Sequence, residues 1–309
     1  MTSTLRRALS LTVTAGAAAA VWGIGIERHL YVLRQHTVAI LPPGTDPIRV
    51  LHLSDIHMAP WQSRKQAWLS SLAALRPDFI VNTGDNLGHP DALRGVRAAF
   101  AGLAGIPGVF VSGSNDHFAP KPRNPLKYFA GPSKRPPKDE PLDNAALQRF
   151  FTEQLGWASL DNASASFEVR GHHIEALGLN DAHVGWDDID ALPSMTQSLA
   201  EEESDLPRIR FAVTHAPYQN LLNAFVDSDA DMLFAGHTHG GQVRLPGFGA
   251  LVANCDIPLK QSRGLSSWKH EGRTVPLNVS AGIGHSIYSP VRFACRPEAS
   301  LITLVPREA

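Results

Sequence analysis

Short apolar runs recur along most of the chain, and stretches with apolar residues three or four apart lie between several of them. Such runs predict buried strands, and the helical spacing predicts helices that cover a sheet. We expect strands over residues 48–53, 78–82, 108–111, 166–170, 172–177, 208–213 and 232–235, followed by β-rich sequence at 250–253, 275–279 and 301–305. We expect helices over residues 63–75, 91–103, 143–155, 187–203 and 217–225.

The clearest unit is the strand, helix and strand between residues 48 and 82. Apolar residues recur at helical spacing from Trp68 to Leu75, Ser63 is placed to cap the helix, and Pro77 ends it. Two strands joined by a helical crossover are normally parallel neighbours in one sheet. The pattern therefore predicts an α/β fold, in which ligand sites gather at the carboxyl ends of the strands.

Length and composition set the size of the folded part. At 309 residues with 43% hydrophobic content, the chain can bury a full core in one large domain or two. We assign residues 48–309 to the main domain, and residues 29–47, which Pro42-Pro43-Gly44 interrupts, to a linker and a first strand. Residues 119–141 are rich in Pro and basic side chains, and they form either a solvated loop or a flap that contacts substrate near the site.

The N-terminal residues 1–28 differ from the rest of the chain. Residues 8–26 carry no charged side chain, and their number is close to the roughly 20 that cross a bilayer. Three interpretations compete: an uncleaved membrane anchor, a signal peptide cleaved after small residues such as Ala17 or Ala20, and a buried helix. The anchor is favoured. Arg6 and Arg7 would then stay in the cytoplasm, which places the domain on the outer face of the cell membrane, with export after signal cleavage as the alternative.

Charge and cysteine content exclude some functions. The formal net charge of −1 argues against a general nucleic-acid binder, because such proteins carry a basic excess. Cys255 and Cys295 are too few for a disulfide scaffold or a cysteine-type zinc site. In an exported domain they would either form one disulfide or remain two buried thiols. None of these features determines the oligomeric state.

Metal-binding side chains follow five of the predicted strands. They are Asp55 and His57, Asp85, Asn115, His215, and His237 with His239. Because His237 and His239 are two apart after a strand, we expect them to point to the same side and share a site. This mixture of nitrogen and oxygen donors suits Fe, Mn, Zn or Co. A carboxylate between two histidine-rich groups can bridge a pair of metal ions, which is a common arrangement for hydrolysing phosphate esters.

These residues resemble the motifs of the calcineurin-like metallophosphoesterase superfamily. Its pattern is Asp-x-His, Gly-Asp, Gly-Asn-His-Asp/Glu, a lone His and Gly-His-x-His. This chain has Asp55-Ile56-His57, Gly84-Asp85, a variant third motif, His215 and Gly236-His237-Thr238-His239. With its apolar N-terminus, the chain looks most like the membrane-associated bacterial branch, which includes cell-wall-associated phosphodiesterases and proteins resembling UDP-2,3-diacylglucosamine hydrolases. The resemblance implies a four-layer α-β-β-α sandwich, preceded here by one transmembrane helix.

The resemblance also implies a role for each metal-binding residue: a first metal ion at Asp55, His57 and His239, a second at Asn115, His215 and His237, and Asp85 as the bridge. A bridging hydroxide would attack phosphorus, and the metal ions would stabilise the charge on the phosphoryl oxygens. The implied activity is hydrolysis of a phosphodiester or pyrophosphate, on lipid-linked or envelope substrates if the site lies outside the cell. The alternative is a catalytically weak relative that binds metals together with phospholipid or nucleotide ligands.

The third motif departs from the family pattern. Aligned without gaps, Ser114-Asn115-Asp116-His117 stands where the family has Gly-Asn-His-Asp. Asp116 thus replaces the histidine that assists the leaving group, and a carboxylate close to two cations favours its charged form and is a poor acid. His117 can carry a proton near neutral pH. In a continuing strand it would point away from Asp116, whereas a turn at Gly113 and Ser114 would bring it round. We therefore expect Asn115 to bind metal and His117, rather than Asp116, to assist the leaving group.

Overall fold

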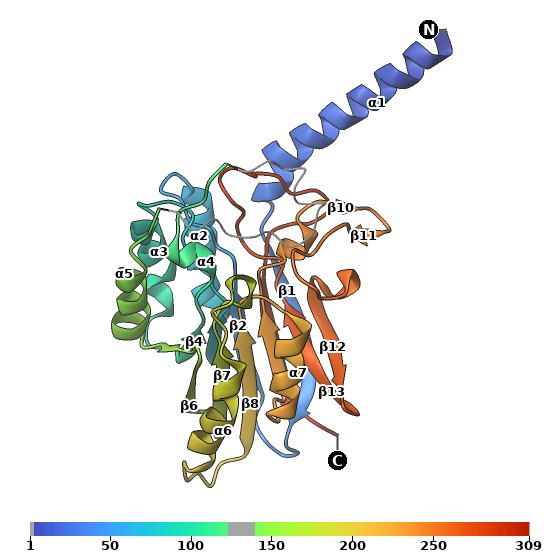
Figure 1. Ribbon diagram of the computed structural model, residues 1–309. Helices are drawn as coiled ribbons and strands as arrows, with labels where there is room; N and C mark the ends of the chain where they lie inside the picture. The colour runs from blue at the N-terminus through green and yellow to red at the C-terminus, as the bar shows by residue number, and fades with distance from the viewer. Residues whose placement is uncertain (1–2, 123–139, 309) are drawn as a thin grey trace.

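Two six-stranded sheets lie face to face at the centre of the computed structural model, which describes residues 3–122 and 140–308 (Figure 1). The first sheet has the order β1 (Val32–Leu41), β14 (Glu298–Pro306), β2 (Ile48–Leu53), β3 (Phe79–Asn82), β4 (Gly108–Phe110) and β5 (Ala158–Ser159). The second has the order β12 (Gly264–His270), β13 (Arg273–Val279), β9 (Met232–Ala235), β8 (Arg208–Thr214), β7 (His172–Leu179) and β6 (Ala163–Val169). In the first sheet all neighbouring strands are parallel except the antiparallel pair β14 and β2. In the second sheet the three central pairs are parallel and the two edge pairs, β12 with β13 and β7 with β6, are antiparallel.

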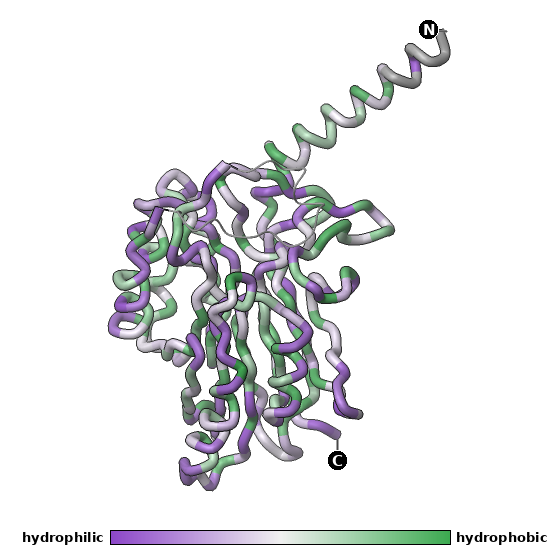
Figure 2. Tube along the Cα trace, viewed as in Figure 1, coloured by the Kyte–Doolittle hydropathy of each residue, from purple (hydrophilic) through white to green (hydrophobic). Residues whose placement is uncertain are grey.

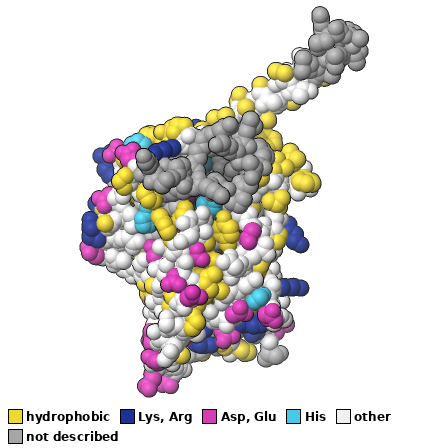
Figure 3. Space-filling model, viewed as in Figure 1, with side chains coloured by type: hydrophobic (Ala, Val, Ile, Leu, Met, Phe, Trp, Pro, Cys, Tyr) yellow, Lys and Arg dark blue, Asp and Glu magenta, His cyan; other side chains and the backbone are white. Residues whose placement is uncertain are grey.

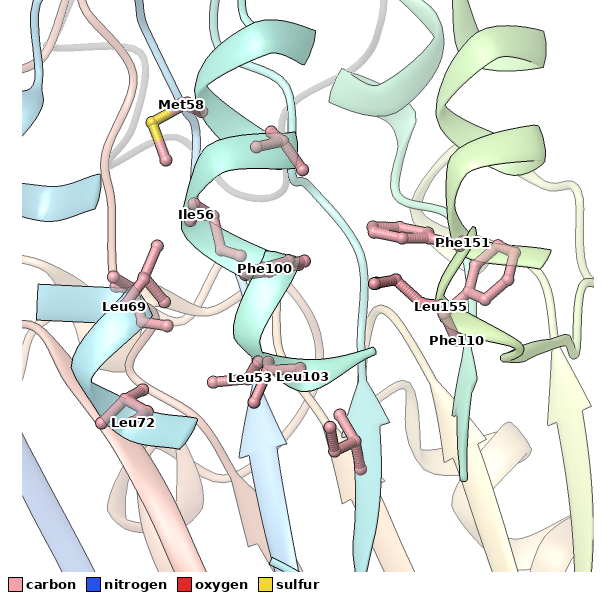
Figure 4. Close-up of a cluster of buried hydrophobic side chains, with 14 of the residues drawn as sticks. Leu53, Ile56, Met58, Leu69, Leu72, Phe100, Leu103, Phe110, Phe151 and Leu155 are labelled. Atoms are coloured by element: carbon pink, nitrogen blue, oxygen red, sulfur yellow. The ribbon is translucent and has the colours of Figure 1, made fainter. Parts of the chain in front are cut away.

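Helices cover the outer face of each sheet, which gives four layers. Side chains of α2 (Ser63–Ser71), α3 (Leu93–Phe100) and α5 (Asn144–Arg149) pack on the first sheet in an apolar cluster that includes Leu53, Phe100 and Phe151 (Figure 4). On the second sheet, α6 (Leu192–Ala200) and α7 (Gln219–Asp227) form a corresponding cluster. The chain thus adopts the expected layered α/β architecture.

Each central strand is apolar on both faces because both faces are covered. In β2, Ile48 and Val50 face the core between the sheets, whereas Leu51 and Leu53 face the helices. In β9, Met232 and Phe234 face the core between the sheets, and Leu233 and Ala235 face the helices. Side chains alternate between the two sides of a strand, so a strand buried on both sides reads as one apolar run. This is why these strands could be located from sequence.

Strand predictions were accurate where the strand is central. The boundaries of β2, β3, β4, β8 and β9 agree with the prediction to within one residue, and β2 and β3 are parallel neighbours as expected. The edge strand β12 was missed, because its half-exposed sequence has no apolar run. The expected loop over 119–141 falls mainly on residues 123–139, which lie outside the described residues.

Helix ends differ from the prediction. Three expected helices end in a turn that is not α-helical. These are the 3₁₀ turns η3 (Leu72–Leu75) and η4 (Ala101–Leu103) and the π-helical turn η6 (Phe150–Leu155). Ser63 does not cap its helix, because it is the first helical residue and Gln62 precedes it without a side-chain cap. Such terminal differences arise because tertiary packing, rather than local propensity, decides where the last turn stops.

The N-terminal helix α1 (Ser3–Val21) stands clear of the sandwich (Figures 1 and 2). It continues into a π-helical turn, Trp22–Ile26, and a 3₁₀ turn, Glu27–His29. Residues 10–29 are long and apolar enough to cross a membrane, with a mean hydropathy of 1.2 and 11% of the segment buried. A signal sequence would have the same length and composition.

Candidate metal centre

The predicted metal-binding residues meet where the carboxyl ends of the parallel strands of both sheets converge. In the first sheet, the turn after β2 is held to the turn after β3, because the Asp55 N–H donates to the Gly84 carbonyl at 2.9 Å. In the second sheet, the Gly236 N–H donates to the His215 carbonyl at 2.8 Å. His215 also joins the two sheets, since its Nδ1 lies 2.7 Å from the Thr83 carbonyl.

One group of ligand atoms comes from Asp55, His57 and His239. The His57 and His239 Nε2 atoms are 3.2 Å apart, and the His239 Nε2 lies 3.4 Å from Asp55 Oδ1. All three ligand atoms lie within 4.8 Å of one another, a spacing that one metal ion can span. Asp55 Oδ1 is buried and accepts no hydrogen bond from the described residues, so a cation would supply its missing partner.

A second group adjoins the first through Asp85. The Asp85 Oδ2 lies 3.5 Å from His57 Nε2 and 3.6 Å from His215 Nε2. Asp55, Asp85 and His215 also place their ligand atoms within 4.8 Å of one another. His237 extends this side, with its Nδ1 3.3 Å from His215 Nε2. The Asp85 carboxylate therefore lies between the two groups.

Asn115 completes the second side. Its backbone N–H donates to Asp85 Oδ1 at 2.9 Å, and its amide nitrogen donates to Asp85 Oδ2 at 2.6 Å. Gly113 lies close to the same carboxylate, and a Cβ at this position would overlap Asp85 Oδ1. The third motif thus packs its backbone directly against the central carboxylate.

Burial keeps three of the four histidines neutral. It lowers the pKa of His57 to about 4 and of His237 to about 3, and it lowers the pKa of His239 well below its usual value. A neutral imidazole has the lone pair that a metal ion requires. Burial acts the same way on His215, but the nearby carboxylates of Asp85, Asp181 and Asp55 outweigh it and raise its pKa to about 10.

The two carboxylates respond differently to the same environment. Burial raises the pKa of Asp55 to about 6. Burial would also raise the pKa of Asp85, but His215 and His57 beside it lower the pKa below its usual value. The Asp85 carboxylate is therefore a buried negative charge, which a bound cation would compensate. The nitrogen and oxygen donors around it fit metal ions.

Five of the candidate ligands have left-handed backbone torsions. The φ angles are 48° at Asp55, 42° at His57, 56° at Asp85, 64° at His237 and 49° at His239. Non-glycine residues rarely adopt this region, and each such residue costs about 1 kcal/mol or more. The strand geometry assumed for His237 and His239 was therefore wrong: the chain leaves the strand at Gly236, and the two imidazoles turn toward different groups.

A buried chain of hydrogen bonds supports Asp55 from behind. Asn278 contacts His52 at 2.7 Å, His52 contacts Thr83 at 3.0 Å, the Thr83 hydroxyl donates to Ser54 at 2.6 Å, and Ser54 donates to Asp55 Oδ2 at 2.5 Å. These residues come from both sheets, and all are buried. The His237 backbone N–H donates to the same carboxylate oxygen at 2.9 Å. The Asp55 carboxylate is therefore fixed in position before any ligand arrives.

The surroundings of Asp116 differ from those expected of an acid that protonates a leaving group. Its carboxylate is fully buried and accepts backbone N–H groups from Asp85 (2.9 Å), Asn86 (2.6 Å), Leu87 (3.1 Å) and Gly113 (3.1 Å). These bonds hold the turn that carries Asp85 against the third motif. The Asp116 carboxylate thus supports the turn that carries Asp85, and its place among the catalytic candidates stays a prediction.

His117 lies in the same turn but in a different environment. Residues Ser114–His117 form a helical turn, α4, rather than a continuing strand, so successive side chains diverge by about 100°. His117 is half-buried, and its ring lies edge-on to Trp186 with 4.8 Å between centroids. The strand geometry considered for this motif is therefore replaced by a turn that separates His117 from Asp116.

Two buried cations near the site were not predicted. The Arg292 guanidinium lies 3.3 Å from His239 Nδ1 and donates to the carbonyls of Ala281 (2.7 Å) and Gly282 (3.2 Å). Lys65 Nζ donates to the Ile56 carbonyl at 2.6 Å, behind His57. Arg292 is 53 residues from His239 in sequence, and no motif singles out either residue.

His183 was also missed. It lies in the short turn η7 (Ala182–Val184), with its ring centroid 4.3 Å from that of His237. Its Nδ1 is 3.1 Å from the Tyr218 hydroxyl. The buried Asp181 carboxylate accepts N–H groups from both His183 and Ser114 at 2.9 Å, which ties this turn to the third motif. His183 follows the expected strand β7 (His172–Leu179), so its position after a strand end was the signal that could have found it.

The two cysteines are separate thiols in the structure. Cys295 is buried and Cys255 is partly buried, and both are free. Burial raises the pKa of the Cys255 thiol to about 12, which leaves it unreactive near neutral pH. Of the two expectations for this pair, the structure has the free thiols.

Comparison with known proteins places the site in a family context. The calcineurin-like phosphoesterase family matches residues 48–241. The chain is 23% identical over 306 residues to the uncharacterised metallophosphoesterase YkuE of Bacillus subtilis, with 94% of this chain and 93% of that protein covered. It is 24% identical over 305 residues to the phosphodiesterase YaeI of Escherichia coli, with 96% and 97% covered. Among solved structures, a dimetal phosphatase from Danio rerio is 10% identical with a TM-score of 0.42, covering 77% of this chain and 88% of that one.

The family match spans more than half of the chain, and all seven predicted ligands lie within it. The residues that it covers are those whose side chains converge in the structure. The protein therefore belongs to the calcineurin-like phosphoesterase family, and it is a metal-dependent hydrolase of phosphoric esters.

Proposed function

We propose that seven residues, called here the floor of the site, hold two metal ions: Asp55, His57 and His239 around one, Asn115, His215 and His237 around the other, and Asp85 between them. The observation that carries this proposal is the position of Asp85, whose Oδ2 lies 3.5 and 3.6 Å from the Nε2 atoms of His57 and His215. Rotating the Asn115 amide by half a turn would direct its oxygen, in place of its nitrogen, toward a cation beside Asp85.

Two metal ions bound here would supply an activated hydroxide and compensate charge on the phosphoryl oxygens. The protein's own residues prepare the site for them. Neutral imidazoles at His57, His237 and His239 offer lone pairs, and Asp55 and Asp85 offer negative charge in a buried setting. The hydrogen bonds behind Asp55 and the backbone bonds to Asp116 keep both carboxylates in place.

We assign leaving-group assistance to His117 and positioning to Asp116. Support comes from the backbone N–H groups that occupy the Asp116 carboxylate, which leave it no free edge toward a substrate. An imidazole beside Trp186, in the same turn as the metal-site residue Asn115, can carry a proton near neutral pH.

The substrate class that we propose is a phosphodiester or pyrophosphate attached to a lipid or envelope molecule. Support comes from the apolar helix α1, whose described side chains Leu11, Val13 and Val21 are exposed, and from Arg7 before the apolar run. An exposed apolar helix is stable in a bilayer, and the preceding arginines favour a cytoplasmic N-terminus with the domain outside. Residues 8–26 would then anchor the protein.

The hydrolytic proposal is tested with purified full-length protein and a panel of substrates under Mn²⁺, Fe²⁺, Zn²⁺ and Co²⁺. The panel contains an aryl phosphomonoester, an aryl phosphodiester, a nucleotide pyrophosphate and a lipid-linked pyrophosphate. We expect metal-dependent cleavage of diesters or pyrophosphates. Binding of these compounds without turnover under every metal would instead favour the weak relative that binds phospholipid or nucleotide ligands.

The orientation is tested with a reporter fused to the C-terminus. A reporter that is active only after export should be active, and protease added to cells with an opened outer envelope should digest the domain. A protected domain would place the site in the cytoplasm and reject the outward orientation.

A further inference from the structure

The exposed apolar side chains of the domain gather at one end. Its large exposed hydrophobic residues include Phe248 (75% exposed), Trp61 (63%), Tyr288 (51%) and Leu245 (49%). Trp61 lies in the loop after β2, Leu245 and Phe248 follow β9, and Tyr288 follows β13, so all four lie toward the end of the sandwich to which these strands point. The helix α1 leaves from that end, and hydrophobic side chains show there near its base (Figures 1 and 3). Monomeric soluble domains normally scatter such residues, so a gathering at one end indicates a contact surface.

The hairpin that carries Phe248 is attached to the metal site at both ends. Strands β10 (Arg244–Leu245) and β11 (Gly249–Ala250) follow directly after His239. The Arg244 guanidinium donates to the Gly240 carbonyl at 2.7 Å. After the hairpin, the Asn254 carbonyl lies 3.2 Å from His237 Nε2. Phe248 therefore projects from a loop whose two ends contact the floor.

The same end binds the segment that follows α1. Glu27 is buried, and its carboxylate accepts the Cys295 N–H at 2.6 Å and the Ala294 N–H at 3.0 Å. The Arg292 N–H donates to the Gly23 carbonyl at 3.1 Å. Gly23 has no room for a side chain, since a Cβ would lie 2.9 Å from the Arg292 carbonyl oxygen. No free linker separates α1 from the domain, so a bilayer around α1 would lie against this end.

We call residues 22–29, 242–254 and 285–295, together with Arg263, the rim. The hairpin and the third segment are joined, because the Gln242 amide donates to the Ser289 carbonyl at 2.7 Å. An open pocket of about 370 Å³ beside the hairpin is lined by Arg244 and Arg263 as well as Leu245 and Phe248. Within the described residues, no carboxylate forms an ion pair with either arginine. Two guanidinium groups that have no carboxylate partner among the described residues, beside apolar side chains, fit a lipid headgroup with a phosphate.

We propose that the rim rests on the surface of a lipid bilayer that carries anionic headgroups, with Phe248 and Leu245 in the acyl boundary and Arg244 and Arg263 at the phosphates. This extends the proposed membrane span and metal site, on which it rests. Aromatic and basic side chains are the residues that settle at this depth of a bilayer. The rim contacts the floor through Asn254 at His237 and Arg292 at His239, so the metal site would lie beside the membrane surface and receive a lipid-linked ester that stays in the bilayer.

The surface is tested in vesicles that contain an anionic phospholipid and the full-length protein with an environment-sensitive fluorophore on a single introduced cysteine. Three variants are compared: Phe248→Cys on the rim, Ala17→Cys in α1, and Glu203→Cys in the exposed loop before β8, at the opposite end of the sandwich. The unsubstituted protein, whose native thiols are buried or partly buried, gives the labelling background.

We expect blue-shifted emission at positions 17 and 248, quenched by lipids with spin labels on their acyl chains, and water-like emission at 203. Water-like emission at position 248 together with blue-shifted emission at position 17 would reject the proposed membrane contact of the rim and would keep α1 as a membrane span. Water-like emission at both rejects the span as well. A blue shift at 248 without quenching by lipid means that protein, such as a second copy of the chain, covers the rim, and it also rejects the proposal.

A second measurement uses activity on two substrates. Phe248→Ser should reduce hydrolysis of a lipid-linked diester in vesicles and leave hydrolysis of a soluble aryl diester unchanged, and Phe248→Trp should restore the lipid activity. Equal loss on both substrates would place Phe248 in support of the floor and contradict the membrane role. If the unsubstituted protein hydrolyses neither ester, the proposed function fails, and the fluorescence result still decides the surface.

Discussion

The floor and the rim of the site are built on opposite principles. The floor consists of buried polar groups on left-handed turns at strand ends, held by hydrogen bonds from both sheets. The rim consists of exposed apolar and basic side chains on loops. Buried polar groups tolerate little change, because each lost partner leaves an unsatisfied donor or acceptor. Exposed side chains can change with little effect on folding. The floor should therefore govern chemistry, and the rim should govern which substrates reach it.

The largest expected effect is the loss of the central carboxylate. Asp85→Asn removes the charge between His57 and His215 without changing the size of the side chain. We expect turnover to fall by about 1,000-fold or more, with metal content reduced, as for the loss of a group that stabilises transition-state charge. Circular dichroism and bound metal are measured alongside activity, and Asp227→Asn at an exposed position serves as the control. Normal metal content with near-normal turnover would contradict the role of the floor.

Asp116→Ala tests support of the floor. Four backbone N–H groups lose their acceptor, so we expect the free energy of unfolding to fall by about 3 kcal/mol. Urea titration measures this change. Asp116→Asn retains one carbonyl acceptor and should lose less. If the alanine variant keeps full stability and loses activity only on substrates with poor leaving groups, Asp116 would be the leaving-group acid.

His117→Ala separates acid assistance from metal binding. If His117 protonates the leaving group, substrates with poor leaving groups should slow by about 100-fold, while aryl esters, which need little protonation, change little. The comparison of the two substrate classes under one metal is the measurement. His270→Ala, at a histidine paired with Asp227 far from the site, is the matched control. Equal losses on both classes would make the third motif a metal-holding turn only.

The smallest effect is expected in the rim. Glu27→Gln keeps one oxygen acceptor for the Ala294 and Cys295 N–H groups but loses the charge. We expect stability to fall by about 1 kcal/mol and hydrolysis of a soluble diester to stay within about twofold. Thermal unfolding and soluble-ester kinetics provide the two readings. A loss of turnover comparable to that of Asp85→Asn would remove the distinction between floor and rim.

The sequence by itself determined the layered fold and the gathering of the floor. Strands such as β2 and β9 are buried on both faces, so their apolar runs locate them without further information. Parallel strands end at one edge of a sheet, so the polar residues that follow them must lie near one another. That is a consequence of topology, and from the sequence alone it predicted that Asp55, His57 and Asp85 lie together.

Tertiary structure alone decided how the third motif is used. The sequence indicated that Asp116 and His117 both stand next to Asn115, and a continuing strand would have sent them to opposite faces. A helical turn forms instead, because the Asp116 carboxylate gathers backbone N–H groups from the turn after β3 and from Gly113. The donors in the turn after β3 are 29 to 31 residues from Asp116 in sequence, and only the paired strands bring them near.

Tertiary structure also decided the surroundings of the floor. Arg292 reaches His239, Lys65 lies behind His57, and His183, in the turn after β7, lies against His237, although none of them belongs to a family motif. The rim depends in the same way on Glu27 meeting Cys295 across 268 positions. Local patterns record which face of an element is buried, because that is set by neighbours along the chain. Contacts between distant loops depend on how the elements pack. The sequence does not predict them, because many loop paths are compatible with the same local pattern.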